Sequence, residues 1–149
     1  MTELRSLTPD EVTAHGAELL SIQHAAYAVE ARLIGDSRIP ALHEDEQNLL
    51  SRGLSWVVAF DDDEVIGALG YTVEDGVVDI DRLTVDPRRH GRGTGTLLVE
   101  AVLWRASAAV VSTGRLNAPA RRLYERLGFR HTGDTEALPG LWLAHYALP

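Results

Sequence analysis

The sequence predicts an α/β domain of the α+β type, with a mixed, mainly antiparallel sheet flanked by helices. Short β-branched runs separated by Asp and Gly turns between residues 55 and 85 indicate a meander of three strands. Helical and extended patterns then alternate in the order β-α-β-α-β-β, which includes one crossover connection. The 149 residues, 45% of them hydrophobic, are enough for one core, so we expect a single domain over residues 1–149.

Helices are expected in the first third of the chain. The run TPDE at residues 8–11 places threonine at a helix cap, proline at the first helical position and glutamate three residues after the cap. The helical pattern continues, with an interruption near Gly16, to Gly35. A second, polar helical segment is expected at about residues 43–52, and a short strand at Leu4–Leu7 can precede the helices.

The three strands of the meander follow. Ser55–Phe60, Val65–Val73 and Val77–Val85 are short and rich in β-branched residues. Asp61–Asp63 is interpreted as a solvated turn, because it lacks the glycine and the distal glutamate of a calcium loop. Asp75-Gly76 is typical of a tight hairpin turn.

The remaining elements alternate between helix and strand. Thr96–Ser107 is apolar nearly all round, as expected of a helix packed on a sheet, and Ala109–Thr113 is a strand. Asn117 caps a further helix that Gly128 closes. The last strands are expected at Phe129–Thr132 and Leu141–Ala147. The three tryptophans, at positions 56, 104 and 142, are expected in the core.

The composition excludes several kinds of chemistry. The chain has no cysteine, so a disulfide scaffold, a thiolate zinc site and a cysteine nucleophile are ruled out. Its 14 basic residues are all arginine, which rules out a Schiff-base lysine and the lysine-containing phosphate loop of P-loop enzymes. We expect no metal site.

The net charge of −8 hides two halves of opposite sign. Residues 1–81 contain four arginines and 17 acidic residues, a net charge of −13, whereas residues 82–149 contain ten arginines and five acidic residues, a net charge of +5. The basic half suits an anionic ligand and the acidic half a cation. We expect no nucleic-acid partner, because the arginines lack interleaved aromatic residues. No leader or membrane-spanning run is visible, so we expect a cytoplasmic protein without a membrane partner.

One segment carries most of the chemical information. The strand that ends at Val85 leads into a turn with glycines at positions 91, 93 and 95, which opens a helix. Amides at a helix start bind anions, and glycine lets the backbone approach a ligand closely. Arg88, Arg89 and Arg92 add charges that can meet further phosphates. The spacing does not fit the dinucleotide fingerprint, which requires a third glycine where Thr96 stands, and a flexible turn without a ligand is the alternative.

A second segment, from Asn117 to Phe129, lies at the right distance to resolve that choice. Together the two segments resemble the GNAT superfamily of acyl-CoA-dependent N-acyltransferases over about residues 53–133. His90 departs from the family pattern, which usually has arginine or glutamine there. The resemblance implies acetyl-CoA as co-substrate, bound by the following residues: Leu83, Thr84, Val85, Arg88, Arg89, His90, Gly91, Arg92, Gly93, Thr94, Gly95, Thr96 and Asn117.

The resemblance also implies direct acyl transfer in a ternary complex. Tyr124 is the expected acid that protonates the thiolate of coenzyme A, although its place on an apolar helix face also fits a core tyrosine. Asp79 and Asp81, two residues apart on one strand, are candidate bases for the amine, with a solvent-facing pair as the alternative. Glu30, His24 and ordered water are rivals for that role.

The acceptor is expected between the N-terminal helices and the far end of the sheet. Because that region belongs to the acidic half, we expect a small cationic amine, with Tyr27 and Glu30 among its contacts. A homodimer is compatible with the sequence. The alternative function is a non-catalytic acyl-CoA-binding or regulatory module on the same fold.

Overall fold

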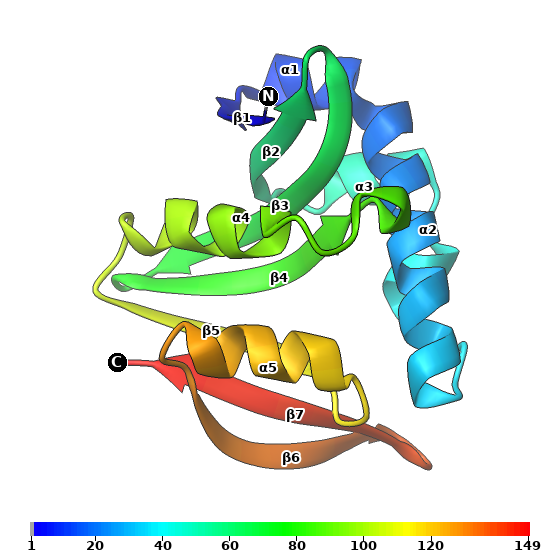
Figure 1. Cartoon of the computed structure of the whole chain (residues 1–149), viewed down its shortest axis with the longest axis vertical. Coiled ribbons are helices and arrows are strands. Elements are labelled where there is room, and N and C mark those ends of the chain that lie inside the picture. The colour runs from blue at the N-terminus through cyan, green and yellow to red at the C-terminus, as the bar shows by residue number, and fades with distance from the viewer. Residues whose placement is uncertain (1) are drawn as a thin grey trace.

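The computed structural model describes residues 2–149 and contains a seven-stranded sheet in the order β1-β2-β3-β4-β5-β7-β6 (Figure 1). The strands are β1 (Thr2–Leu7), β2 (Ser55–Asp61), β3 (Glu64–Glu74), β4 (Val77–Val85), β5 (Ala108–Gly114), β6 (Arg130–Leu138) and β7 (Leu141–Leu148). All neighbouring pairs are antiparallel except β4 and β5. The predicted fold class, the meander and the crossover are confirmed.

Helices cover both faces of the sheet. They are α1 (Pro9–Ala14), α2 (Gly16–Ile34), α3 (Glu46–Ser51), α4 (Thr94–Leu103) and α5 (Ala118–Arg126), with short 3-10 turns η1 (Pro40–His43) and η2 (Pro87–Arg89). Figure 1 shows α4 and α5 side by side on one face, while the long α2 runs down one side of the molecule. The predicted capping box is present: the Thr8 and Glu11 side chains each accept a hydrogen bond from the backbone N–H of the other residue.

Two apolar clusters lie on opposite faces of the sheet. Under α4 and α5, side chains such as Val78, Leu98 and Tyr146 are almost completely buried. Under α1, α2 and α3, Leu19 and Phe60 belong to the second cluster. Both faces of β2 and of most of β3 are therefore excluded from water, which explains the nearly continuous apolar runs of these two strands.

Two predicted elements were wrong in extent. The predicted helix 96–107 begins two residues earlier and ends at Leu103, so Trp104 is 90% exposed and does not belong to the core. The predicted strand 129–132 instead runs over nine residues, Arg130–Leu138. Every residue of β6 is exposed, so no apolar alternation marked its full length.

The sheet opens between its two parallel strands. β4 pairs with β5 only over Val77–Ile80 and Ala108–Val111, and beyond that the strands separate. Asp81 is an extra residue at this point, because Tyr71 and Gly70 of β3 pair with Ile80 and Arg82. Such a bulge bends its strand and re-aims the side chains that follow. In residues 2–149, no helix is long and apolar enough to cross a membrane.

Candidate active site

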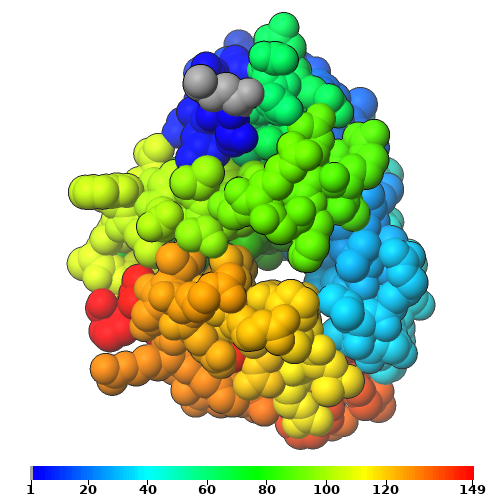
Figure 2. Space-filling view, viewed as in Figure 1, coloured from blue at the N-terminus to red at the C-terminus, as the bar shows by residue number. Residues whose placement is uncertain are grey.

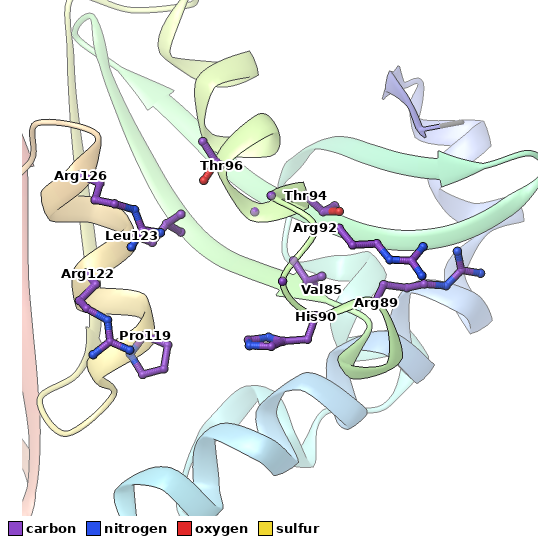
Figure 3. Close-up of a pocket in the computed structure, with 13 residues that line it drawn as sticks. Val85, Arg89, His90, Arg92, Thr94, Thr96, Pro119, Arg122, Leu123 and Arg126 are labelled. Carbon is purple, nitrogen blue, oxygen red and sulfur yellow. The ribbon is translucent and has the colours of Figure 1, made fainter.

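A cavity of about 320 Å³, here called the loop cavity, lies between the start of α4 and helix α5 (Figure 3). The glycine-rich segment lines it from Arg89 to Thr96, together with Val85. Across from this segment, α5 contributes Pro119, Arg122, Leu123 and Arg126. The loop cavity therefore brings together the two segments singled out in the sequence.

The backbone of the loop exposes unpaired amides to this cavity. Gly91 and Gly93 have φ angles of 80° and 75°, in the left-handed region that favours glycine. Gly93 is the cap of α4, and no side chain accepts a hydrogen bond from the first turn of that helix. The earliest backbone bond of the helix is from Leu97 N–H to the Gly93 carbonyl, so the amides of residues 94–96 stay available for an anion.

The arginines predicted to meet phosphates have a different arrangement. Arg88 does not line the loop cavity and instead pairs with Asp86 and Glu64. Arg89 pairs with Asp61 and Glu64. In Figure 3 the Arg89 and Arg92 side chains point away from α5, whereas the His90 ring extends toward it. Asp86 and Glu64 hold Arg88 outside the lining of this cavity, and a contact between Arg88 and a phosphate stays a prediction.

A second cavity, here called the central cavity, lies where β4 and β5 separate. It measures about 100 Å³ and is lined by Tyr124, Leu83, Asn117 and parts of α2 and β5. Figure 2 shows the molecule hollowed where the blue α2, the green segment after β4 and the yellow α5 meet. Thr84 faces away from both cavities and donates its hydroxyl hydrogen to the Ala68 carbonyl.

Tyr124 is buried in the wall of the central cavity. Only 3% of the residue is exposed, and its ring packs edge-on against Phe129. Burial, assisted by the negative charge of Glu30, raises the pKa of the Tyr124 phenol. Within residues 2–149 its hydroxyl has no hydrogen-bond partner. The phenol therefore keeps its proton and has that proton available for a ligand in the cavity.

Glu30 connects α2 to β5 and α5. Its Oε1 atom accepts hydrogen bonds from the Asn117 amide at 3.0 Å and the Thr113 hydroxyl at 3.2 Å. The Asn117 carbonyl oxygen accepts from Ala120 N–H, so Asn117 caps α5 as predicted. Since Glu30 and Asn117 both line the central cavity, these bonds hold two parts of its wall together.

A third cavity, here called the outer cavity, continues from the central one toward η1 and β7. It measures about 320 Å³ and shares Tyr27, Glu30 and Ser112 among other residues with the central cavity. Its apolar wall comes from α2, η1 and β7, through residues such as Ile34, Ile39 and Leu141. Burial raises the pKa of the Tyr27 phenol, so Tyr27 presents a neutral hydroxyl.

A buried arginine organises the charges of the outer cavity. Arg82 is 5% exposed and donates to Glu44, to Gln23 Oε1 at 2.9 Å and to Asp81 Oδ2 at 2.8 Å. The more exposed Arg52 pairs with the same two carboxylates. Burial alone would raise the pKa of Glu44, but hydrogen bonds from Arg82 and Gln23 outweigh it and hold the pKa below its usual value.

Of the two predicted bases, only Asp81 lines a cavity of the site. Asp81 lines the central and outer cavities, but both Arg52 and Arg82 bond to it. Asp79 lines neither cavity, and burial together with the charge of Asp81 raises its pKa. His24 Nε2 donates a hydrogen bond to the Glu44 carbonyl oxygen at 2.7 Å.

Sequence reasoning missed several residues that line these cavities. Arg122 and Arg126 lie four residues apart on α5, a spacing that places them on one helix face and that could have been read from the sequence. Ser112 lines the central and outer cavities, and its Oγ atom lies 2.6 Å from Nδ1 of His145. No sequence signal joins these two residues, because they come together only through the pairing of β5 with β7.

The sequence and the fold are both similar to those of known proteins. Residues 18–129 match the model of the acetyltransferase (GNAT) family. N-acetylaspartate synthetase of Rattus norvegicus is 37% identical over 118 residues, which cover 70% of this chain and only 40% of that relative, so the chain spans less than half of its length. Peptidyl-lysine N-acetyltransferase YjaB of Salmonella typhimurium is 28% identical over 121 residues, 81% of both chains.

Among solved structures, PaiA N-acetyltransferase from Thermoplasma acidophilum in complex with coenzyme A has the same fold. Its TM-score is 0.75 and its sequence identity 15%, over 97% of this chain and 98% of that one.

Proposed function

Because this chain belongs to the GNAT acetyltransferase family, we propose that it transfers an acetyl group from acetyl-CoA to a primary amine by direct attack in a ternary complex. The observation that carries the proposal is the series of cavities across the opened sheet. An anion-binding loop lies on one side, a protonated tyrosine lies at the centre, and a charged cavity lies on the other side.

The residues present suit acetyl-CoA. The amides of residues 94–96 and the guanidinium groups of Arg122 and Arg126 suit the phosphates. Beyond Ile80 the edge of β4 that faces β5 has no strand partner among residues 2–149, so its amides suit the extended pantetheine arm. A main-chain N–H near Leu83 or Val85 is then the expected donor to the thioester carbonyl oxygen.

The chemical step needs two proton transfers. The amine nitrogen forms the new N–C bond, the C–S bond breaks, and the nitrogen loses one proton. Tyr124 donates its phenolic proton to the departing thiolate, because its raised pKa keeps the phenol protonated at neutral pH. No covalent enzyme intermediate is required, which agrees with the absence of cysteine.

We further propose that the acceptor is a small cationic amine that enters through the outer cavity. Three carboxylates, Glu30, Glu44 and Asp81, line this cavity against two arginines, Arg52 and Arg82. The names of the relatives favour two other acceptors, an aspartate amino group and a peptidyl-lysine amino group. Arg52, with a side chain 44% exposed, is the group that would meet a carboxylate of an aspartate-like acceptor.

Calorimetry and an acceptor panel test this function. Acetyl-CoA is titrated first, and binding in the micromolar range is expected; absence of heat at millimolar ligand would overturn the proposal. Spermidine, L-lysine amide, a lysine-containing peptide and L-aspartate are then compared by release of free thiol. Acetyl-CoA binding without turnover of any amine would favour the non-catalytic acyl-CoA-binding module.

The role of Tyr124 has a direct test. Tyr124→Phe should keep acetyl-CoA affinity within a few-fold and lower kcat by about 10²-fold or more, since general acids contribute about 10²–10⁴-fold. Tyr71→Phe is the matched control, because Tyr71 is equally buried in the same apolar cluster but lines none of the three cavities. Equal kcat values for both variants would remove Tyr124 from the acid role.

A further inference from the structure

We propose that Ser112 and His145 form the proton relay that deprotonates the acceptor amine. In this relay Ser112 Oγ takes the proton from the amine and passes its own hydroxyl proton to Nδ1 of His145. The inference rests on the proposed acetyl transfer and identifies the base for that reaction. It departs from the expectation, drawn from the sequence, that Asp79 or Asp81 removes the proton.

The geometry of the pair supports this role. Ser112 lies on β5 just beyond Val111, the last residue that pairs with β4, so it stands at the point where the sheet opens. Ser112 lines both the central cavity, which contains Tyr124, and the outer cavity. Its Oγ atom lies 2.6 Å from His145 Nδ1, a strong hydrogen-bond distance.

A third group orients the imidazole. His145 Nε2 lies 2.7 Å from the hydroxyl oxygen of Thr135 on β6. β7 pairs with β5 on one side and β6 on the other, so His145 is held between Ser112 and Thr135 by the sheet itself. A nucleophile or relay hydroxyl, an imidazole and an orienting group in this order form a recurrent catalytic arrangement.

The carboxylates near the cavities are less suited to accept the proton. Asp81 already accepts hydrogen bonds from Arg82 at 2.8 Å and from Arg52 at 3.2 Å. Glu30 Oε1 accepts from Asn117, Thr113 and the Gly114 N–H. Asp79 lines neither the central nor the outer cavity. Among residues 2–149, the Ser112 hydroxyl bonds to no arginine, and its hydrogen-bond partner is the His145 imidazole.

The relay requires one tautomer of His145. Nδ1 must be unprotonated to accept from Ser112, and Nε2–H must then donate to the Thr135 hydroxyl. Within residues 2–149, Ser112 and Thr135 are the polar side chains bonded to the ring, and no carboxylate or arginine contacts it from β5, β6 or β7. Once protonated, the half-buried imidazole loses its proton to solvent, and the relay returns to its starting state.

Kinetics test the relay with the panel amine that the wild-type chain acetylates fastest. His145→Gln and Ser112→Ala should each lower kcat by about 10²-fold, as expected for loss of a general base, with acetyl-CoA Kd unchanged within twofold. Thr132→Val is the matched control, because Thr132 donates to the His145 carbonyl and does not touch its ring.

Each outcome decides a different question. If no amine reacts with the wild-type chain, the proposed function fails and the relay with it. If the wild type is active and both variants keep its kcat, the relay alone is overturned. Unfolding midpoints of the variants separate loss of the relay from loss of the fold.

A measurement without turnover tests the tautomer. ¹⁵N NMR of the imidazole in the wild-type protein should show an unprotonated Nδ1 and a protonated Nε2 for His145. Thr135→Val should change the tautomer ratio, whereas Thr132→Val should not. A protonated Nδ1 in the neutral imidazole would overturn the relay, because Ser112 would then have no acceptor for its proton.

Discussion

Replacing Arg82 by methionine should destabilise the protein far more than the same change at Arg52. Arg82→Met removes a guanidinium with a side chain only 4% exposed, and Met has a similar length without charge. The change removes the guanidinium that bonds to both Glu44 and Asp81, and it leaves the Gln23 side-chain oxygen without its donor. Removing one partner of a buried ion pair costs about 3–5 kcal/mol.

The expected loss lies near the lower end of that range. Arg52 remains 3.5 Å from Glu44 and 3.2 Å from Asp81, and the Asp81 side chain is 28% exposed, so water and Arg52 compensate part of the lost charge. We therefore expect Arg82→Met to lower the free energy of unfolding by about 3 kcal/mol. For a chain of this size, that corresponds to a fall in Tm of about 6–12 °C.

Arg52→Met is the matched control because Arg52 binds the same two carboxylates from a largely solvated position. Exposed ion pairs contribute about 0–1 kcal/mol, so this variant should lose no more than about 1 kcal/mol. Urea unfolding, followed through the fluorescence of the buried Trp56, gives both values, and the m-values should agree. Similar losses in the two variants, or a loss below about 1 kcal/mol for Arg82→Met, would refute the argument from burial.

Two further predictions concern the loop cavity. Gly93→Ala should lower the free energy of unfolding by about 1–2 kcal/mol, measured by thermal unfolding. The cause is backbone strain alone, because φ is 75° and no described atom lies within 4 Å of the added Cβ. Gly95→Ala, whose Cβ would meet only ordinary contacts at 3.7 Å or more, should cost less, and equal losses would contradict the strain argument. Arg122→Ala combined with Arg126→Ala should weaken acetyl-CoA binding at least about tenfold in calorimetry, since hydrogen bonds to charged groups contribute about 1.5–3 kcal/mol each. Arg130→Ala, an exposed arginine outside the loop cavity, is the control, and an equal effect there would indicate only a general field.

Local signals in the sequence were sufficient for most of the fold. The capping box at Thr8 and the Asp75-Gly76 turn, whose residues have φ angles of 51° and 78°, depend on neighbouring residues alone. The end of α4 was misplaced because Trp104 continues the apolar pattern, although the helix ends at Leu103 and Trp104 is 90% exposed. An apolar residue in the sequence need not be buried, because only the three-dimensional arrangement decides whether another element covers it.

The candidate site was predictable where it is contiguous in the chain. All residues from His90 to Thr96 line the loop cavity, and they are consecutive in the sequence, so a local motif was enough to find them. The link between Ser112 and His145 depends on the β5–β7 register across 33 residues, and no local pattern encodes such a register. The position of Arg88 outside the loop cavity could not be predicted, because the sequence shows its charge but not that Asp86 and Glu64 pair with it.

Ion pairs also reduce the effect of the charge difference between the two halves of the chain. Arginines of the basic half bind carboxylates of the acidic half: Arg82 binds Glu44, and Arg89 binds Asp61. These ion pairs offset part of the charge of each half within the fold, while the net charge of −8 remains. When ionised, the three carboxylates and two arginines of the outer cavity leave one net negative charge. Selectivity for a cationic over a neutral amine should consequently be modest and should weaken with salt, because a single, partly solvated charge is screened within about 10 Å at 0.1 M ionic strength.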